Sequence, residues 1–219
     1  MPPSSETSNP WAKLPASEFV LPEDRPLIDD FNRKTRAIDD TLIPEPFLGL
    51  PNAPVVLLNL NPGLSQEDTK WHKNPQFIAQ SRANLFHAAT PYPFFLLNPD
   101  LDAPGCRWWS RKLRWLVDRV ERRTVASRLL CVEYFPYHTR IGGRFPLLPS
   151  QGYGFNLVRA AIHRSAIIVV LRSEKRWIEA VPELRRYRRR YNLQSPQNVS
   201  VSPRNCPEGF NEIVRSLSA

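Results

Sequence analysis

The sequence predicts an α/β fold: a three-layer α/β/α sandwich around a central four-stranded parallel sheet. Two observations lead to this prediction. Short apolar runs of strand length recur along the chain, and stretches with helical spacing of apolar residues separate them. Strands that alternate with helices form parallel sheets covered on both faces, with right-handed crossovers. The four expected strands are residues 55–60, 129–135, 166–171 and 198–202.

Helices are expected between and before these strands, at residues 25–39, 107–120, 152–165 and 173–184. The second of these has the clearest pattern of apolar side chains at helical spacing. Its apolar positions are Trp109, Leu113, Leu116, Val117 and Val120.

The length of 219 residues fits one domain with a core of its own, which we place at residues 25–219. Residues 1–24 are rich in Pro, Ser and Glu and are expected to form a flexible arm, although Trp11 and the apolar "EFVLP" could pack on the body. We expect a monomer.

The N-terminus lacks the basic and apolar regions of a signal peptide, and no apolar run approaches the roughly 20 residues that span a bilayer. We therefore expect a cytoplasmic protein with no membrane partner. Three scattered cysteines are too few for a disulfide framework or a four-cysteine metal site. We expect reduced thiols, no metal and no cofactor.

The charge is unevenly distributed. Residues 1–100 carry 8 Lys and Arg against 12 Asp and Glu, a net −4, whereas residues 101–219 carry 22 against 9, a net +13. Nearly all the cations of the second half are arginines, which suit phosphate contacts and stacking on bases. The charge favours a nucleic-acid partner, and a solvated basic face is the alternative.

The chain contains neither a P-loop nor a dinucleotide-binding GxGxxG motif, so a nucleotide cofactor has no support. Polar loops instead follow three of the expected strands: "NLNPG", "EYFPYH" and "SVSPRN". Ligands of open parallel sheets bind beyond the carboxyl ends of the strands. These three loops are therefore expected to converge on one crevice.

The first and last of these loops carry a resemblance to a known family. "NLNPG" resembles the first motif of the uracil-DNA glycosylase superfamily, with Asn59 where the family usually has Gly, and "SVSPRN" resembles the second motif of its single-strand-selective monofunctional branch. "NPG" by itself is also a common turn sequence. The resemblance covers residues 54–210 by order and spacing, and it implies the same fold.

The resemblance implies hydrolysis, without metal or cofactor, of the N-glycosidic bond of a nucleotide flipped out of DNA. Asn61 takes the position that orients the attacking water, unless it only caps its turn. Phe95, or Phe94 beside it, takes the position of the aromatic side chain that stacks on the base, although either could be plain core.

Two departures from the family bear on the substrate. Glu133 stands where relatives have an Asn that reads uracil, and a carboxyl group suits the N4 amino group of cytosine better; pairing with an arginine is the alternative. Ser200 replaces the His of the second motif, so either His138 or Tyr137 is expected to assist the leaving base, or a modified base needs less assistance to leave.

The same loop is expected to contact DNA. Ser200, Ser202 and Pro203 would hold the backbone, while Arg204 and Asn205 would enter the space left by the flipped nucleotide; an ordinary surface turn is the alternative. The run "RRYRRRY", which includes Arg188 and Arg189, is either a phosphate-binding segment or a solvated surface.

The sequence thus predicts a monofunctional DNA glycosylase that excises a non-standard pyrimidine, with modified cytosine favoured. Glucosylated hydroxymethylcytosine of phage DNA is one substrate that family analogy suggests. The alternatives are a uracil-DNA glycosylase of base-excision repair, a non-catalytic DNA-binding module of the same fold, and an unrelated flavodoxin-like domain with a basic surface.

Overall fold

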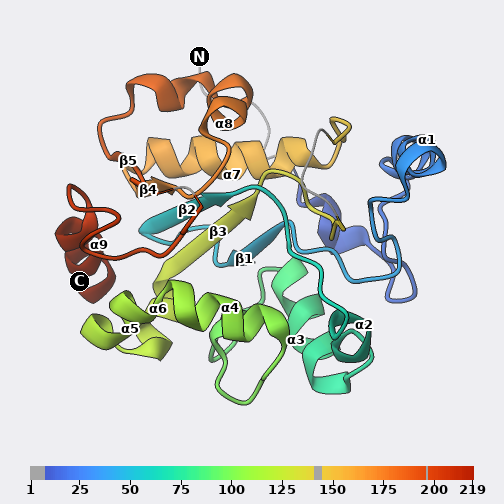
Figure 1. Ribbon diagram of the computed structural model, residues 1–219, viewed down its shortest axis with the longest axis horizontal. Coiled ribbons are helices and arrows are strands. Elements are labelled where there is room, and N and C mark those ends of the chain that lie inside the picture. The colour runs from blue at the N-terminus through green and yellow to red at the C-terminus, as the bar shows by residue number, and fades with distance from the viewer. Residues whose placement is uncertain (1–7, 141–144, 196) are drawn as a thin grey trace.

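The computed structural model describes residues 8–140, 145–195 and 197–219. These residues form an α/β fold in which a mostly parallel sheet lies between two helical layers (Figure 1). The strands are β1 (Phe47–Gly49), β2 (Val55–Asn59), β3 (Leu129–Glu133), β4 (Ile167–Val170) and β5 (Arg190–Asn192). The α-helices are α1 (Arg25–Thr35), α2 (Asp68–Trp71), α3 (Pro75–Leu85), α4 (Pro104–Lys112), α5 (Arg114–Val120), α6 (Arg122–Arg128), α7 (Gln151–His163), α8 (Glu174–Ala180) and α9 (Phe210–Ser218).

The sheet has five strands within the described part of the chain, in the order β1-β3-β2-β4-β5. Strands β3, β2, β4 and β5 are mutually parallel, and β1 pairs with β3 in the antiparallel sense. The α/β class is confirmed, and so are the first three expected strands. The expectation of four strands was wrong, because β1 adds an antiparallel edge that is only three residues long and flanked by Pro-rich sequence.

The fourth parallel strand was predicted at the wrong place. It is Arg190–Asn192, inside the arginine run, and residues 198–202 form an irregular segment. Val199 and Val201 of that segment are fully buried, which explains their strand-like alternation. The Val201 amide donates to the carbonyl of Lys112 at the end of α4, at 3.0 Å, and not to a neighbouring strand.

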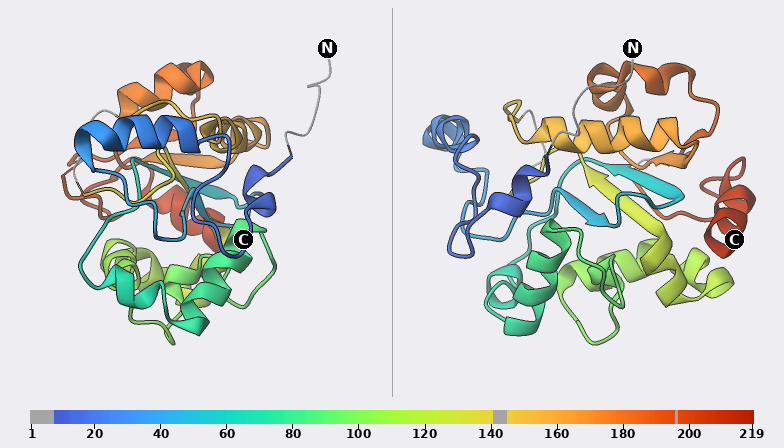
Figure 2. Two further views of the ribbon diagram at one scale, coloured as in Figure 1. Left: turned by 90° about the vertical axis from the view of Figure 1, so that its right-hand side faces the viewer. Right: turned by 180° about the vertical axis from the view of Figure 1, so that it is seen from behind.

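Two apolar clusters cover the two faces of the sheet. Val55, Leu57 and Cys131 belong to the cluster with side chains of α3 to α6, whereas the alternate residues, such as Val56 and Leu58, belong to the cluster with side chains of α7 and α8. These two groups of helices lie on opposite faces of the sheet (Figure 2). This period of two fixes the face onto which each later residue of a strand projects. By the same alternation, the side chains of Asn59 and Glu133 project onto the face covered by α3 to α6.

The expected helices are present with shorter bounds. The helix predicted at 107–120 is two helices, α4 and α5, which meet at Leu113, and the helix predicted at 25–39 ends at Thr35, where Arg36 adopts a left-handed conformation (φ 50°). Residues 152–165 and 173–184 correspond to α7 and to α8 followed by a short 3₁₀ helix, Pro182–Arg186.

The N-terminal segment packs on the body from residue 8 onward. A 3₁₀ helix at Pro10–Lys13 places Trp11 against the ring of Tyr137, with the centroids 5.8 Å apart, and Trp11, Val20 and Leu21 are buried. Residues 1–7 of the expected flexible arm lie outside the described residues. The three cysteines are unpaired and buried. Among the described helices, none is long and apolar enough to cross a bilayer.

Candidate active site

A cavity of about 290 Å³ opens beyond the carboxyl ends of β2 and β3. It collects side chains from the loops after β2 and β3, from the segment before β1, from α2 to α4 and from Arg172, the second residue after β4. The residues that line it are Glu45, Asn59, Asn61, Pro62, Gly63, Leu64, Ser65, Asp68, Phe77, Leu96, Ala103, Pro104, Gly105, Trp108, Trp109, Glu133, His138 and Arg172.

Asn59 and Glu133 form a polar pair at the base of this cavity. They are register partners at the ends of adjacent parallel strands, and the Asn59 Nδ2 donates to Glu133 Oε1 at 3.0 Å. Both side chains are buried, yet Asn59 Oδ1 and Glu133 Oε2 have no hydrogen-bond partner within the described residues. A buried polar atom without a partner is costly, so this pair is prepared to receive a ligand with its own donors and acceptors.

Burial raises the pKa of Glu133 to about 8, and nearby Glu45 adds to the rise, while the hydrogen bond from Asn59 opposes it. A protonated carboxyl group can donate through one oxygen and accept through the other. Glu133 can therefore present to a ligand either an acceptor alone or a donor and an acceptor together.

The loop that follows β2 holds Asn61 in a fixed orientation. Its Nδ2 donates to the carbonyl of Pro62 at 2.7 Å and to Thr139 Oγ1 at 2.9 Å. Both amide hydrogens are thereby used, which leaves the carboxamide oxygen as the acceptor that the side chain can offer to a water in the cavity.

His138, which precedes Thr139 in the chain, contacts the same loop after β2. Its Nδ1 lies 2.6 Å from the carbonyl oxygen of Gly63, and its Nε2 lies 3.1 Å from the carbonyl oxygen of Ile43. Only a ring that carries a proton on both nitrogens can donate to both carbonyls. Backbone carbonyls thus contact both ring nitrogens of His138 at the wall of the cavity.

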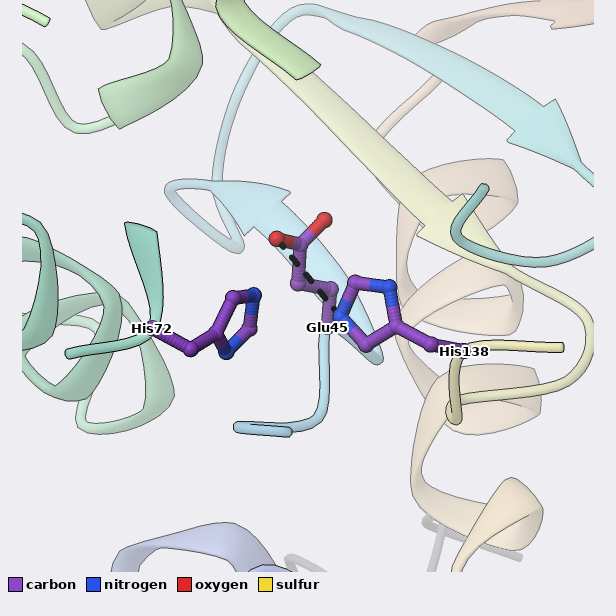
Figure 3. A group of neighbouring side chains, drawn as sticks. All are labelled: Glu45, His72 and His138. Carbon is purple, nitrogen blue, oxygen red and sulfur yellow. Dashed lines mark ion pairs between the residues drawn. The ribbon is translucent and has the colours of Figure 1, made fainter. Parts of the chain in front are cut away.

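Glu45 and His72 complete a buried cluster with His138 (Figure 3). Glu45 Oε1 lies 4.0 Å from His138 Nε2, and the two imidazole rings meet edge to face at 5.1 Å. Burial raises the pKa of Glu45 to about 7, although the charge of His138 opposes the rise. Burial lowers the pKa of His72 to about 3, so this ring is neutral.

The cluster has the residue types of a metal site, since one ligand atom from each side chain lies within 4.8 Å of the others. Its hydrogen bonds oppose that use. His72 Nδ1 accepts from the Ile43 amide at 2.9 Å, so the proton of the neutral ring is on Nε2, the nitrogen turned toward Glu45 in Figure 3. Both nitrogens of His138 face carbonyls. A metal ion would have to displace the hydrogen-bond partners or protons of these ring nitrogens. The observed hydrogen bonds therefore favour a cluster that binds protons over one that binds a metal.

The aromatic wall of the cavity differs from the expected one. Phe94 and Phe95 are fully buried and do not line the cavity; they pack against Trp109 and Phe77, at 5.1 and 5.5 Å between centroids. Both are core residues, because the 3₁₀ turn at Phe95–Leu97 directs this segment under the sheet. Phe77 of α3 and the half-buried Trp108 of α4 supply the aromatic surface.

Tyr137 was also assigned wrongly to base binding. Its hydroxyl donates to Asp24 Oδ2 at 2.7 Å and accepts from the Leu21 amide at 3.2 Å, and it does not line the cavity. Burial raises the pKa of both Tyr137 and Asp24. The residue anchors the N-terminal segment, while its neighbour His138 points the opposite way into the site.

The loop at residues 200–205 lies outside the cavity lining. Asn205 turns inward: its Oδ1 accepts from the Ser195 amide at 2.8 Å, and its Nδ2 donates to the carbonyls of Asn198 and Ser200. Ser202 Oγ accepts from the Asn205 amide. Only Pro203 and Arg204 are exposed. The expected wedge of Arg204 and Asn205 is therefore wrong for Asn205, whose buried amide holds the loop together.

This loop nevertheless borders the site. Lys112 at the end of α4 donates to Asn198 Oδ1, which also accepts from the Ser200 hydroxyl at 3.1 Å. The Lys112 ammonium lies 5.8 Å from the ring of Trp108, which lines the cavity. Ser200 is thus linked to the cavity through Lys112 and Trp108, with no direct contact.

The two arginines singled out in "RRYRRRY" have different surroundings. Arg188 is exposed, whereas Arg189 pairs with Glu212 of α9 at 2.7 Å and also donates to the Ser165 carbonyl. Arg189 therefore stabilises the packing of α9. For the exposed Arg188, binding to DNA phosphates stays a prediction.

Several site residues were missed in the sequence. Arg172 is the second residue after β4, so the rule that predicted loops at strand ends could have found it. Within the described chain its guanidinium has no hydrogen bond or ion pair, and its charge lowers the pKa of Glu133. Glu45, Asp68, Phe77 and Trp108 carry no local signal, because they precede a very short strand or belong to ordinary amphipathic helices.

Comparisons of this chain with protein-family models, with curated protein sequences and with solved structures find no significant match.

Proposed function

We propose that this protein is a monofunctional DNA glycosylase, with a fold of the uracil-DNA glycosylase type, that hydrolyses the N-glycosidic bond of a non-standard pyrimidine flipped out of DNA. The observation that carries the proposal is the Asn59–Glu133 pair. Two neighbouring strand ends present an unpartnered amide oxygen and an unpartnered carboxyl oxygen to the cavity, beside the Asn61 loop.

The pair favours a cytosine-type base. Asn59 Oδ1 and an ionised Glu133 accept hydrogen bonds, as an exocyclic amino group requires, and a protonated Glu133 can also donate to the ring N3. Uracil offers a carbonyl at the position of that amino group, where it would face Asn59 Oδ1 and, when Glu133 is ionised, a second acceptor. Modified cytosine is therefore the preferred substrate, and glucosylated hydroxymethylcytosine of phage DNA remains the proposed example.

The mechanism assigns a role to each side chain of the cavity. Asn61 orients the attacking water through its carboxamide oxygen without removing its proton fully, because an amide is a weak base. The glycosidic bond breaks toward an oxocarbenium-like sugar and an anionic base. His138, which lines the cavity and whose ring nitrogens face backbone carbonyls, assists the leaving base in place of the missing histidine at Ser200.

DNA is the proposed partner of a monomeric protein. Arg172 and Lys112 are cations at or beside the cavity, and Arg188 and Arg204 are exposed on the same basic half of the sequence. Such groups bind phosphates without reading sequence.

The test is release of free base, detected by mass spectrometry, from DNA that contains uracil, hydroxymethylcytosine or glucosylated hydroxymethylcytosine. Wild type is compared with Asn61→Ala. Release of a cytosine-type base that is lost in the variant would support the proposal. Release of uracil alone would support the repair enzyme, and no release from DNA that is bound in a salt-sensitive way would support a non-catalytic module.

A further inference from the structure

The cavity is larger than a pyrimidine requires. A cytosine ring occupies roughly 100 Å³ at protein packing density, about a third of the 290 Å³ that the cavity offers. With the base held at Asn59 and Glu133, most of the cavity volume is left for a substituent on the base.

The remaining polar lining is rich in carboxyl groups. Glu45 is nine-tenths buried, and within the described residues its carboxyl oxygens have no hydrogen bond; its Oε1 lies 4.0 Å from His138 Nε2. Asp68 uses Oδ2 to accept from the Ser65 amide at 2.5 Å, and the buried Ser65 hydroxyl has no partner. Within the described residues the Ser65 hydroxyl, like Asn59 Oδ1 and Glu133 Oε2, is therefore a buried polar atom without a partner, and the Glu45 carboxyl group beside it can accept hydrogen bonds from a ligand.

The charges of the lining exclude charged substituents. Arg172 and His138 line the same cavity and disfavour a cation, while Glu45 and Asp68 disfavour an anion. A neutral group that donates hydrogen bonds to carboxyl oxygens fits both conditions. Hydroxyl groups do this, and an aromatic wall such as Phe77 and Trp108 packs well against the C–H face of a polyol ring.

We propose that Glu45 and Asp68, with Phe77 and Trp108, form a subsite for a neutral, hydroxyl-rich substituent on the flipped base. This inference rests on the proposed function and names the class of base that the enzyme selects. Asn59 and Glu133 bind the base itself, and the four residues of the subsite bind its substituent.

The experiment measures binding, so that it does not depend on turnover. Labelled single strands carry one cytosine, one hydroxymethylcytosine or one glucosylated hydroxymethylcytosine, and Kd is measured by fluorescence anisotropy in the Asn61→Ala background. Two added hydroxyl hydrogen bonds at about 1 kcal/mol each predict roughly 10- to 30-fold tighter binding of the glucosylated strand than of the cytosine strand.

Glu45→Leu should reduce this preference by about 10-fold, because it removes both acceptors in a similar volume. Glu45→Gln, which keeps one acceptor, should retain part of the preference and guards against a folding defect. Glu179→Gln, an exposed glutamate on α8, is the matched control.

No preference in the parent, or a full preference that survives Glu45→Leu, would overturn the subsite. A preference that depends on Glu45 in a protein that releases no base would support the subsite while the proposed catalysis fails. The two failures are therefore distinguishable.

Discussion

The two loops that resemble glycosylase motifs have different positions in the structure. The loop after β2 borders the cavity: Asn61 and Gly63 line it, next to Asn59 at the end of β2. His138, which also lines the cavity, contacts Gly63, and Thr139 accepts from Asn61. The loop at residues 200–205 lies outside the lining and uses its polar groups on itself. A motif that follows a central strand is thus positioned by the sheet, whereas a motif at the periphery is positioned by its own hydrogen bonds.

Exchange of two asparagines for alanine should give the largest contrast between these loops. Asn61→Ala should lower the rate of base release by about 100-fold or more with little change in Tm, because it removes a group that acts on the water. Asn205→Ala should instead lower the free energy of unfolding by about 2–3 kcal/mol, because it leaves backbone groups unpaired. Release assays and urea unfolding measure the two effects. Arg204→Ala, at an exposed position, is the control for Asn205. Equal losses of stability in both loop variants would contradict the contrast.

The buried carboxyl groups at the cavity, unlike the loop at residues 200–205, should make the free energy of unfolding depend on pH. Burial raises the pKa of Glu133 from 4.5 to about 8 and that of Glu45 from 4.5 to about 7. In this window the folded state holds protons that the unfolded state releases, so the free energy of unfolding should fall as the pH rises from about 4.5 to 8.

Glu133→Gln should remove its share of this slope, as measured by urea unfolding at several pH values. Glu179→Gln should leave the slope as in wild type. A slope that is unchanged in Glu133→Gln would show that Glu133 has an ordinary pKa.

Thr139→Val should have the smallest effect. It removes the hydroxyl that accepts from Asn61 Nδ2, and one such bond at about 1 kcal/mol predicts a loss of roughly 5-fold in kcat. KM should change little, and Thr139→Ser should restore the rate. A drop in Tm without any change in kcat would assign Thr139 a purely structural role.

Much of the site follows from local sequence and the rules of parallel sheets. The apolar runs located β2, β3 and β4, and their carboxyl ends located Asn59, Asn61 and Glu133. The period of two in the strands even places Asn59 and Glu133 on one face, since each continues the alternation of Leu57 and Cys131. His138 was found because it follows the same strand end.

Other features were decided by tertiary structure alone. Val199 and Val201 have the alternation of a strand, but Val201 donates to the end of α4, and strand pairing goes to Arg190–Asn192, which carries no apolar pattern. Phe94 and Phe95 could have been a stacking face or core, and only the turn that buries them decides between the two.

The sequence by itself therefore determined the α/β class and the polar groups at the ends of the central strands, because both depend on short-range periodicity. Tertiary structure alone brought Glu45, Asp68, Phe77 and Trp108 to the same cavity. These residues are far apart in the chain and belong to segments with ordinary local patterns, so their proximity depends on how the helices and the edge strand pack on the sheet.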